Sequence, residues 1–466
     1  MLAAAWAAYP AWLNPGDNAW QLTAATLVGL MSVPGLVVLY GGVMQKRWSV
    51  NSMMLAFVAF GLVLIAWVLW GFEMGFGNPW HGLSSSGFFG NFVGQPGAVL
   101  NHLEEQGQAA IPLVTTGPPF HFPQSTLVYF QFVFAAITPI LMLGSVLGRV
   151  NFKAWMVFVP LWLTCVYVVN AFLIWGGGFW AQKGAVDYSG GYVIHLAAGV
   201  SGFVAAAVIG PRLARDREID APNNLLMVAA GAGLLWLGWN GFNGGDPYYA
   251  GADAAAAVLN TNLATAVAFL VWVIWDYMTG RKPSLIGSVN GMIVGLVAIT
   301  PAAGFVNGYG AMAIGAIGAS VVYLAYNYLS RVRPFRNVDD TLGVVYTHGF
   351  AGLVGGLLVG VFADSNMIVY LGLGKTPSFA AEGSLHLLKI QLYAGLWVIL
   401  FSGVATFVLL KLVGLVIPLR MSDADLEVGD IAVHGHEVYP SDVPSLGYTG
   451  SVPSLTPPPT PEPAGG

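Results

Sequence analysis

The feature that most constrains this chain is a series of eleven long apolar segments, each about as long as a membrane-crossing helix. A helix needs about 20 mostly apolar residues to cross the hydrocarbon core of a bilayer. The segments cover residues 19–43, 52–73, 124–148, 154–175, 190–210, 224–242, 254–278, 284–301, 304–329, 343–363 and 390–417. Spanning β-strands would instead give short stretches of alternating polarity. We therefore predict an all-α membrane protein with eleven transmembrane helices.

The low charge content supports this prediction and excludes other classes of protein. Only 8% of the 466 residues are charged, against about 25% in an ordinary soluble domain. The net charge of −5 provides no basic field for nucleic acid. The single cysteine, Cys165, excludes an internal disulfide framework and a cysteine-based zinc site. A soluble enzyme, a disordered chain and a nucleic-acid binder are therefore excluded.

The distribution of lysine and arginine predicts the orientation in the membrane. Fourteen of the 17 basic residues fall on one set of connections or where the last segment ends: Lys46, Arg47, Arg149, Lys153, Arg212, Arg215, Arg217, Arg281, Lys282, Arg331, Arg333, Arg336, Lys411 and Arg420. The other set holds only Lys183, Lys375 and Lys389. Cytoplasmic connections carry the excess of Lys and Arg. We therefore predict a multi-pass protein of the cell membrane, with its N-terminus outside and its C-terminus in the cytoplasm.

The segments outside the helices divide the chain further. Residues 1–18 lack the basic start and the apolar run of a signal peptide, and we interpret them as an external segment. Residues 74–123 are rich in Gly, Pro and Ser, which predicts a long external loop within a transmembrane domain of residues 19–417. Residues 440–466 contain Pro, Ser, Thr and Gly with almost no large apolar side chains, which predicts a disordered tail.

A repeated motif relates the two halves of the chain. The fifth apolar segment contains HLAAGVSG at residues 195–202, and the tenth contains HGFAGLVG at residues 348–355. The sequence AITP also occurs twice, at residues 136–139 and 298–301. Both pairs are five segments apart, and an odd offset reverses the direction through the membrane. We therefore predict an inverted repeat of five plus five helices with one added helix, an architecture that many transporters share.

The repeated motif places His195 and His348 inside apolar helices at matching positions. Ionisable residues inside a membrane are costly and mark transport pathways by default. One such histidine alone is more often a core residue bonded to a backbone carbonyl. Two histidines that meet at one axis can share a hydrogen bond and pass a proton. They could instead bind a metal, but two ligands without a nearby carboxylate or thiolate make a poor site.

The absence of charge within the predicted spans constrains what crosses. No Asp, Glu, Lys or Arg falls in the middle of a segment, and an isolated ion in such a medium pays tens of kcal/mol. An amine avoids this cost by releasing its proton, at roughly 3–4 kcal/mol at pH 7 for a pKa of about 9–10. An apolar path with two histidines therefore suits a protonatable amine better than sodium or potassium. A neutral solute such as carbon dioxide or water also remains compatible.

Aromatic residues near the predicted outer ends of the spans suit a small cation. Phe130 and Phe134 are four residues apart and share one helix face. Trp175 ends the fourth segment, and Trp239 and Phe242 lie near the end of the sixth. An aromatic face attracts a cation by roughly 0.5–2 kcal/mol. Taken singly, each of these rings is more often a packing residue.

Further motifs give the chain a family resemblance. They include PGLVVLYGG at 34–42, GSVLGRVNFKAWMVFVPLWL at 144–163, DYSGGYVIHLAAG at 187–199, GWNGFNGG at 238–245 and VDDTLGVVYTHGFAG at 338–352. On these motifs the chain resembles the ammonium transporters of the Amt/Mep/Rh superfamily, and it is most similar to their Mep-like and plant AMT2-like branch. The resemblance runs from about residue 16 to residue 439.

The resemblance implies a homotrimer of eleven-helix subunits, each with its own pore for ammonium or ammonia and also for methylammonium. Phe134 and Trp175 match the aromatic pair of the outer ammonium site, and Phe134 with Phe242 matches the gate below it. The resemblance implies the remaining roles as follows: Gln131 is a polar helper near the gate, Asp187 supports the recruitment site, and His195 and His348 are the pore histidines.

The resemblance also covers residues 418–439, which are similar to the family's cytoplasmic regulatory region. Relatives use this region to couple subunits, and some of them dock a PII-type signal protein there. A PII-type protein is therefore a candidate partner of this chain.

Three positions depart from the family pattern. Asp246 stands where relatives often have a serine at the outer site; it could bind ammonium, accept its proton, or only start the turn before Pro247. Asn290 stands where many relatives have serine or glutamine near the pore. Gly343 replaces an acidic residue that often lies five positions before the second histidine, which puts a cytoplasmic-side contact in doubt.

These observations predict a transporter rather than an enzyme, without a metal or other cofactor. Ammonium would bind at the outer site and lose a proton near the gate, and ammonia would pass the histidines with electrogenic return of the proton. A passive ammonia or carbon dioxide channel of the Rh type and an ammonium receptor with a signalling tail are the alternatives. An intramembrane metalloenzyme is disfavoured because no acidic third ligand accompanies the two histidines.

Overall fold

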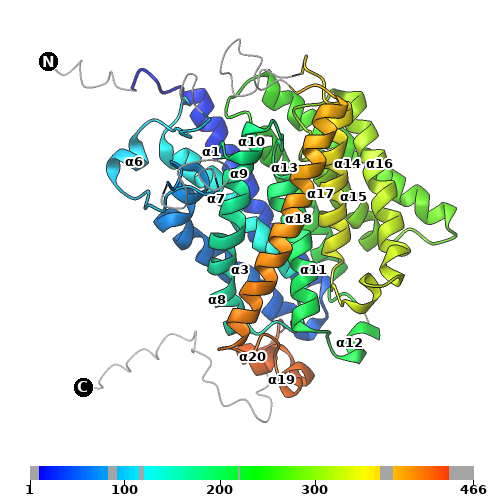
Figure 1. Ribbon diagram of the computed structural model, residues 1–466. Helices are drawn as coiled ribbons and strands as arrows, with labels where there is room; N and C mark the ends of the chain where they lie inside the picture. The colour runs from blue at the N-terminus through cyan, green and yellow to red at the C-terminus, as the bar shows by residue number, and fades with distance from the viewer. Residues whose placement is uncertain (1–9, 82–91, 115–119, 219–220, 368–380, 440–466) are drawn as a thin grey trace, which may run out of the picture.

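The computed structural model describes residues 10–81, 92–114, 120–218, 221–367 and 381–439. Within these residues the backbone forms helices and three isolated β-bridges but no extended strand. The predicted disordered tail at 440–466 lies outside the described residues. The chain is a bundle of long, roughly aligned helices, with α18 running along one side over nearly the full height (Figure 1).

The α-helices fall into the order that the apolar segments predict. They are α1 (Pro15–Leu30), α2 (Val37–Val43), α3 (Ser49–Ala66), α4 (Phe72–Phe76), α6 (His102–Gln106), α7 (Gln124–Leu143), α8 (Phe152–Trp162), α9 (Val168–Ile174), α10 (Phe179–Gln182), α11 (Ala197–Ile209), α12 (Ala214–Glu218), α13 (Leu225–Gly244), α14 (Ala252–Met278), α15 (Leu285–Ile299), α16 (Gly308–Asn327), α17 (Ala351–Phe362), α18 (Leu385–Gly414), α19 (Asp423–Val428) and α20 (Asp430–His434).

The described helices include ten stretches long and apolar enough to cross a membrane, and α15 is a shorter apolar helix of 15 residues. Several of these stretches join two or three helices. In Pro15–Val43 a π segment links α1 to α2; in Phe152–Gln182 a π segment links α8 to α9, and a short turn separates α9 from α10. Leu237 and Leu400 are 64% and 65% exposed, and large apolar side chains left outward on long helices fit contact with lipid. The prediction of an eleven-helix, all-α membrane protein is confirmed.

Several helix boundaries differ from the sequence prediction, and local capping explains two of them. The first helix begins at Pro15 rather than near residue 19, because the side chain of Asn14 accepts hydrogen bonds from the amides of Gly16 and Asp17. The ninth span begins at Gly308 rather than near residue 304, because Asn307 caps it through the amide of Gly310. Asparagine is a preferred residue at this position of a helix.

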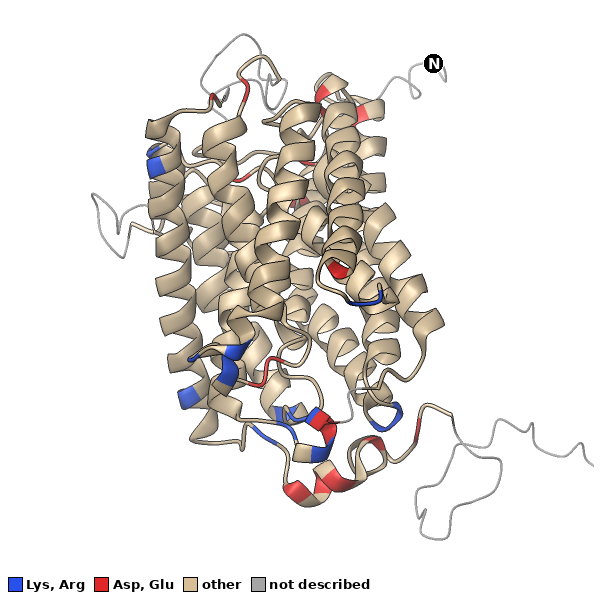
Figure 2. Ribbon diagram, turned by 90° about the vertical axis from the view of Figure 1, so that its right-hand side faces the viewer, with Lys and Arg blue, Asp and Glu red and all other residues tan. Residues whose placement is uncertain are grey.

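Lysine and arginine gather toward one end of the bundle, where α19 and α20 also lie (Figure 2). We call this the basic end and define it by Lys46, Arg47, Arg149 and Arg212. The other end, where α1 begins and α6 and α10 lie (Figure 1), is called the vestibule end after the cavity described below.

The two histidine-bearing helices start from opposite ends and meet inside the bundle. Each opens with a six-residue π-helical segment, Gly191–Leu196 before α11 and Val345–Phe350 before α17. A π-helical turn within an α-helix is rare and occurs frequently at functional sites. These two segments position the candidate site.

Candidate functional site

His195 and His348 face one another in the centre of the bundle. Their Nδ1 atoms are 3.2 Å apart, and the ring centroids are 5.3 Å apart with an interplanar angle of 23°. A hydrogen bond at this distance requires one Nδ1 to donate and the other to accept. His195 is completely buried and His348 is 7% exposed. The pair is therefore a hydrogen-bonded link through an otherwise closed interior.

Glycines of the repeated motif allow this close meeting. A Cβ atom on Gly199 would lie 2.3 Å from the backbone nitrogen of Gly349, and one on Gly352 would lie 2.4 Å from the carbonyl oxygen of Gly191. Contacts this short leave no space for any side chain. The two helices therefore cross with backbone against backbone.

A carboxylate begins each histidine-bearing helix. Asp187 accepts hydrogen bonds of 2.6–3.2 Å from the amides of Gly190, Gly191, Tyr192 and Val193. Burial raises the pKa of Asp187 to about 6, although these four amides oppose the rise. The four bonds show Asp187 as a cap that occupies both of its oxygens with backbone.

Asp340 has the corresponding place in the second half, which the sequence analysis missed. Its Oδ2 accepts a 2.8 Å hydrogen bond from the amide of Val345. Asp187 and Asp340 each lie eight residues before their histidine, and this shared spacing was the available signal. Gly343, whose φ is +70°, lies in the turn between cap and helix. An acidic residue near His348 is therefore present as Asp340, three residues before Gly343.

A series of aromatic rings leads to the histidines. Trp175 meets Phe134 edge to face at 6.2 Å, and Phe134 lies 4.5 Å from Phe242 between ring centroids. Phe242 in turn stacks on His195 at 5.9 Å. Trp239, which the sequence analysis placed only near a helix end, also stacks on His195 at 5.3 Å. Of the two proposed gate rings, Phe242 thus lies directly against the first histidine, and Phe134 contacts Phe242.

A cavity of about 360 Å³ opens beside these rings, and we call it the vestibule. It is lined by Trp175, Asp187, Asp246, Tyr248 and Glu382, among others. Asp246 is 4% exposed. The vestibule therefore brings three carboxyl groups, those of Asp187, Asp246 and Glu382, and the Trp175 ring to the same space.

The loop from Gly245 to Gly251, the vestibule loop, carries Asp246 and Tyr248. The hydroxyl of Tyr248 accepts a 2.6 Å hydrogen bond from the side-chain amide of Gln131. Tyr248 has a φ of +60°, which a bulky residue rarely adopts. The structure thus places Gln131 as an anchor of the vestibule loop.

Two residues from outside the vestibule hold the far side of this loop. Asp17 accepts a 2.9 Å hydrogen bond from the amide of Ala250, and its other oxygen lies 3.3 Å from Nδ1 of His121. His121 also packs against Tyr249, with ring centroids 5.2 Å apart. No sequence pattern indicates these contacts, because they join residues that are far apart in the chain.

A second cavity, of about 100 Å³, lies on the other side of the histidines. It is lined by His348, Asn290, Tyr326 and Thr341 together with many aliphatic side chains. The structure therefore places Asn290 beside His348 and away from the vestibule.

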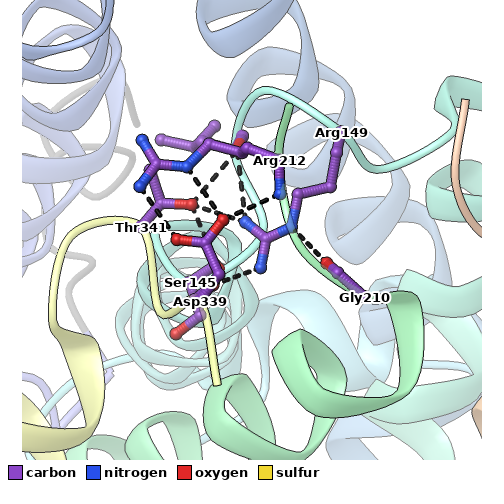
Figure 3. Close-up of polar contacts among 7 residues, drawn as sticks. Ser145, Arg149, Gly210, Arg212, Asp339 and Thr341 are labelled. Atoms are coloured by element: carbon purple, nitrogen blue, oxygen red, sulfur yellow. Dashed lines mark hydrogen bonds and ion pairs between the residues drawn. The ribbon is translucent and has the colours of Figure 1, made fainter. Parts of the chain in front are cut away.

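Arginines at the basic end hold the loops around this second cavity (Figure 3). Arg149 is completely buried and donates hydrogen bonds to Gly210, to Leu147, to the hydroxyl of Thr341 and to the backbone of Asp339. Arg212 pairs with Asp339 through two side-chain bonds of 2.9 and 3.1 Å. We call Arg149, Arg212, Asp339 and Thr341 the basic-end cluster; the sequence analysis used its arginines only for topology.

The segment after α18 packs on the basic end. The carboxylate of Asp430 accepts hydrogen bonds of 2.8 Å from the amides of Val50 and Asn51 at the start of α3. Met421 donates a backbone hydrogen bond to the carbonyl of Arg149, which links this segment to the basic-end cluster. Among the described residues, no group of three or more His, Cys, Asp or Glu side chains is arranged to hold a metal.

Comparison with known proteins gives a consistent result. A model of the Ammonium Transporter Family matches residues 19–439. Ammonium transporter 3 member 2 of Oryza sativa subsp. japonica is 48% identical over 436 residues, which cover 92% of this chain and 90% of the rice protein. Ammonium transporter 2 of Arabidopsis thaliana is 48% identical over 434 residues, which cover 92% and 89%. The crystal structure of Saccharomyces cerevisiae Mep2 superimposes with a TM-score of 0.75 at 28% identity and covers 89% of each chain.

Proposed function

The chain belongs to the ammonium transporter family, and we propose that it binds ammonium in the vestibule, removes one proton there and passes ammonia along the two histidines. The observation that carries this proposal is the unbroken series of ring contacts from Trp175 through Phe134, Phe242 and His195 to His348. This series joins the vestibule to the cavity at the basic end.

Recruitment uses the vestibule. The faces of Trp175 and Phe134 attract a small cation, and Asp246 adds a carboxyl group in the same cavity. Asp187 has a supporting role, because its oxygens are occupied by four backbone amides. Methylammonium is a substrate on the same grounds, since the cavity of about 360 Å³ holds a molecule one methyl group larger.

The gate separates the vestibule from the histidines. Phe134 and Phe242 close the path at 4.5 Å between ring centroids, and Gln131 supports it through Tyr248. A neutral molecule passes such an apolar constriction at far lower cost than an ion. Deprotonation therefore precedes passage.

The histidine pair carries the proton that ammonium loses. The hydrogen bond between the two Nδ1 atoms provides a transfer path, because each imidazole can accept a proton on one nitrogen and release one from the other. Asn290 offers a polar contact where ammonia leaves His348. Transport is then electrogenic.

The setting of the pore completes the proposal. The vestibule faces outward and the basic end faces the cytoplasm, because most Lys and Arg residues lie at that end. The N-terminus is then external to the cell membrane. The functional unit is a homotrimer with one pore per subunit, and residues 418–439 are the regulatory region at which a PII-type protein docks.

The test is the current across proteoliposomes after an ammonium pulse, with the ammonia-driven pH change followed in parallel. Wild type should give a current. His195→Ala and His348→Ala should lose the current and keep the ammonia flux, because only the proton path is broken. His102→Ala, at an exposed position of α6, is the matched control and should behave as wild type.

Other outcomes point to the alternatives. A rapid pH change without current in wild type would identify a passive gas channel. No current and no flux would favour an ammonium receptor, and either result would overturn the electrogenic mechanism.

A further inference from the structure

Asp246 is a buried carboxyl group with an unused oxygen in the vestibule. It is 4% exposed, and its Oδ2 atom is buried without a hydrogen-bond partner. A buried polar atom without a partner costs about 1–3 kcal/mol by general experience. A ligand that enters the cavity can therefore supply the hydrogen-bond donor that this oxygen lacks.

No cation is among the groups that shift the pKa of Asp246, although His386 also lines the vestibule. Burial raises its pKa well above the ordinary value, the carboxyl of Asp187 raises it further, and a contact with Ser189 opposes the rise. None of these influences comes from a Lys, Arg or His side chain. A cationic ligand is thus the group that would stabilise the ionised form of Asp246.

Asp187, the other buried carboxyl group of the vestibule, is not equivalent. Its Oδ1 accepts from the amides of Gly190 and Gly191, and its Oδ2 accepts from those of Tyr192 and Val193. A proton placed on either oxygen would break hydrogen bonds that cap the helix. Asp246 is the carboxyl group of this cavity with a free lone pair and no structural bond to lose at that oxygen.

We propose that Asp246 is the base that receives the proton of ammonium in the vestibule. This inference rests on the proposed function and names the group that performs its first chemical step. One N–H bond of ammonium breaks, its electron pair stays on nitrogen, and an O–H bond forms at Oδ2. The ion pair of ammonium and carboxylate becomes ammonia and a neutral carboxylic acid.

Burial makes this transfer feasible. In water an amine and an aspartic acid differ by roughly five to six pKa units, so the proton stays on the amine. Removing both groups from water disfavours both charges, which raises the pKa of the acid and lowers that of the amine. The burial of Asp246 raises the pKa of its carboxyl group and so reduces the pKa difference between the amine and the acid. An exposed carboxylate at the rim, such as Glu382, would attract ammonium without accepting its proton.

The test compares two amines of nearly equal size and different basicity, methylammonium and hydroxylamine, by uptake into proteoliposomes at pH 7. Methylammonium must lose a proton before passage, whereas hydroxylamine is a weak base that is already largely neutral. Asp246→Asn should lower methylammonium uptake about 100-fold, the lower end of what a positioned acid–base group contributes. Hydroxylamine uptake should remain within about threefold of wild type.

Two further variants complete the design. Asp246→Glu keeps the carboxyl group and should retain part of the methylammonium uptake. Glu382→Gln removes an exposed vestibule charge and should raise the half-saturating concentration without changing the ratio between the two amines. Hydroxylamine uptake in the same vesicles reports whether each variant has folded with an open pore.

Equal losses of both amines in Asp246→Asn, or no loss of either, would overturn the inference and leave the proposed function intact. If wild type itself takes up neither amine above the level of empty vesicles, the proposed function fails instead.

Discussion

At the vestibule end, Asp187 begins the first histidine-bearing helix, and neither it nor the neighbouring Asp246 has a cation among the groups that influence its pKa. At the basic end, Asp340 begins the second such helix, and burial again raises its pKa, but the Arg149 guanidinium opposes the rise. The adjacent Asp339 is paired with Arg212. The two halves therefore both begin a histidine-bearing helix with an aspartate, but Asp187 accepts from more amides, and only the basic end places arginines beside its carboxyl groups.

This difference gives a pseudo-symmetric pore a direction for cation capture. A cation that enters the vestibule meets Asp246, whose Oδ2 atom has no hydrogen-bond partner. At the basic end Asp339 is already paired with Arg212, so a cation gains less by binding there. On the proposed function, the position of the arginines therefore favours cation capture at the vestibule end, although the backbone repeats.

Removing the two caps should give unequal losses. Asp187→Ala should lower the free energy of unfolding by at least about 4 kcal/mol, because four amides lose a charged acceptor at about 1 kcal/mol or more each. Asp340→Ala should cost less, since fewer amides depend on it. Thermal unfolding of the detergent-solubilised variants measures both, and equal losses would contradict the asymmetry.

Breaking the ion pair of the basic-end cluster should have the next largest effect. Arg212→Gln should destabilise the protein by roughly 3–5 kcal/mol, because it leaves Asp339 buried without its partner. Arg217→Gln, at an exposed position of α12, is the control and should stay within about 0.5 kcal/mol. Adding Asp339→Asn to Arg212→Gln should recover stability, and a simple sum of two losses would show that the pair is not the cause.

The two ends should also respond to pH in different windows. The pKa of Asp187 in the folded protein is about 6, against about 3.9 for an unfolded aspartate. The folded protein therefore binds more protons between pH 4 and 6, so the advantage of wild type over Asp187→Asn is complete near pH 4. It should be lost as the pH rises through 6, by up to about 3 kcal/mol.

Asp339 provides the control for this pH prediction. Burial opposes the effect, but the hydrogen bonds and charge of Arg212 hold its pKa below the ordinary value. The advantage of wild type over Asp339→Asn should therefore be constant between pH 5 and 7 and decline only in stronger acid. Melting temperatures of the three proteins across this range test both statements, and parallel curves would refute them.

Loosening the vestibule loop should produce the smallest effect. Asp17→Asn weakens the contacts to Ala250 and His121, and about 1 kcal/mol of lost hydrogen bonding corresponds to about a fivefold higher half-saturating concentration of methylammonium. The maximal rate should be unchanged, since Asp17 does not line the vestibule. Glu105→Gln in α6, which is exposed, is the matched control.

The sequence predicted the features that depend on composition and spacing. Eleven apolar segments and the distribution of Lys and Arg predicted the helices, and the repeated histidine motif predicted which two helices meet. His195 and His348 do lie within hydrogen-bond distance. These features can be predicted from the sequence because the thickness of the membrane sets the length of each apolar segment and the helical repeat sets the spacing of its residues.

The features that depend on which loops touch could not be predicted in the same way. Arg149 bonds to residues about 60 and 190 positions away, and nothing near it in sequence indicates those partners. Trp239 stacks on His195 because of how two helices cross. The position of Asp340 is an exception, because it could be predicted from the sequence. Asp340 lies eight residues before His348, as Asp187 lies eight residues before His195.

On the proposed mechanism, the glycine crossing of the two histidine-bearing helices determines whether the pore conducts protons or passes only ammonia. Gly199 and Gly352 allow the helices to come into backbone contact, and the imidazoles lie 3.2 Å apart beside this crossing. On the proposed mechanism, a methyl group at either glycine would push the helices apart and open a gap in the proton wire. A neutral molecule would still find its way through the widened gap. On this mechanism, the absence of side chains at Gly199 and Gly352 distinguishes an electrogenic pore from one that passes only ammonia.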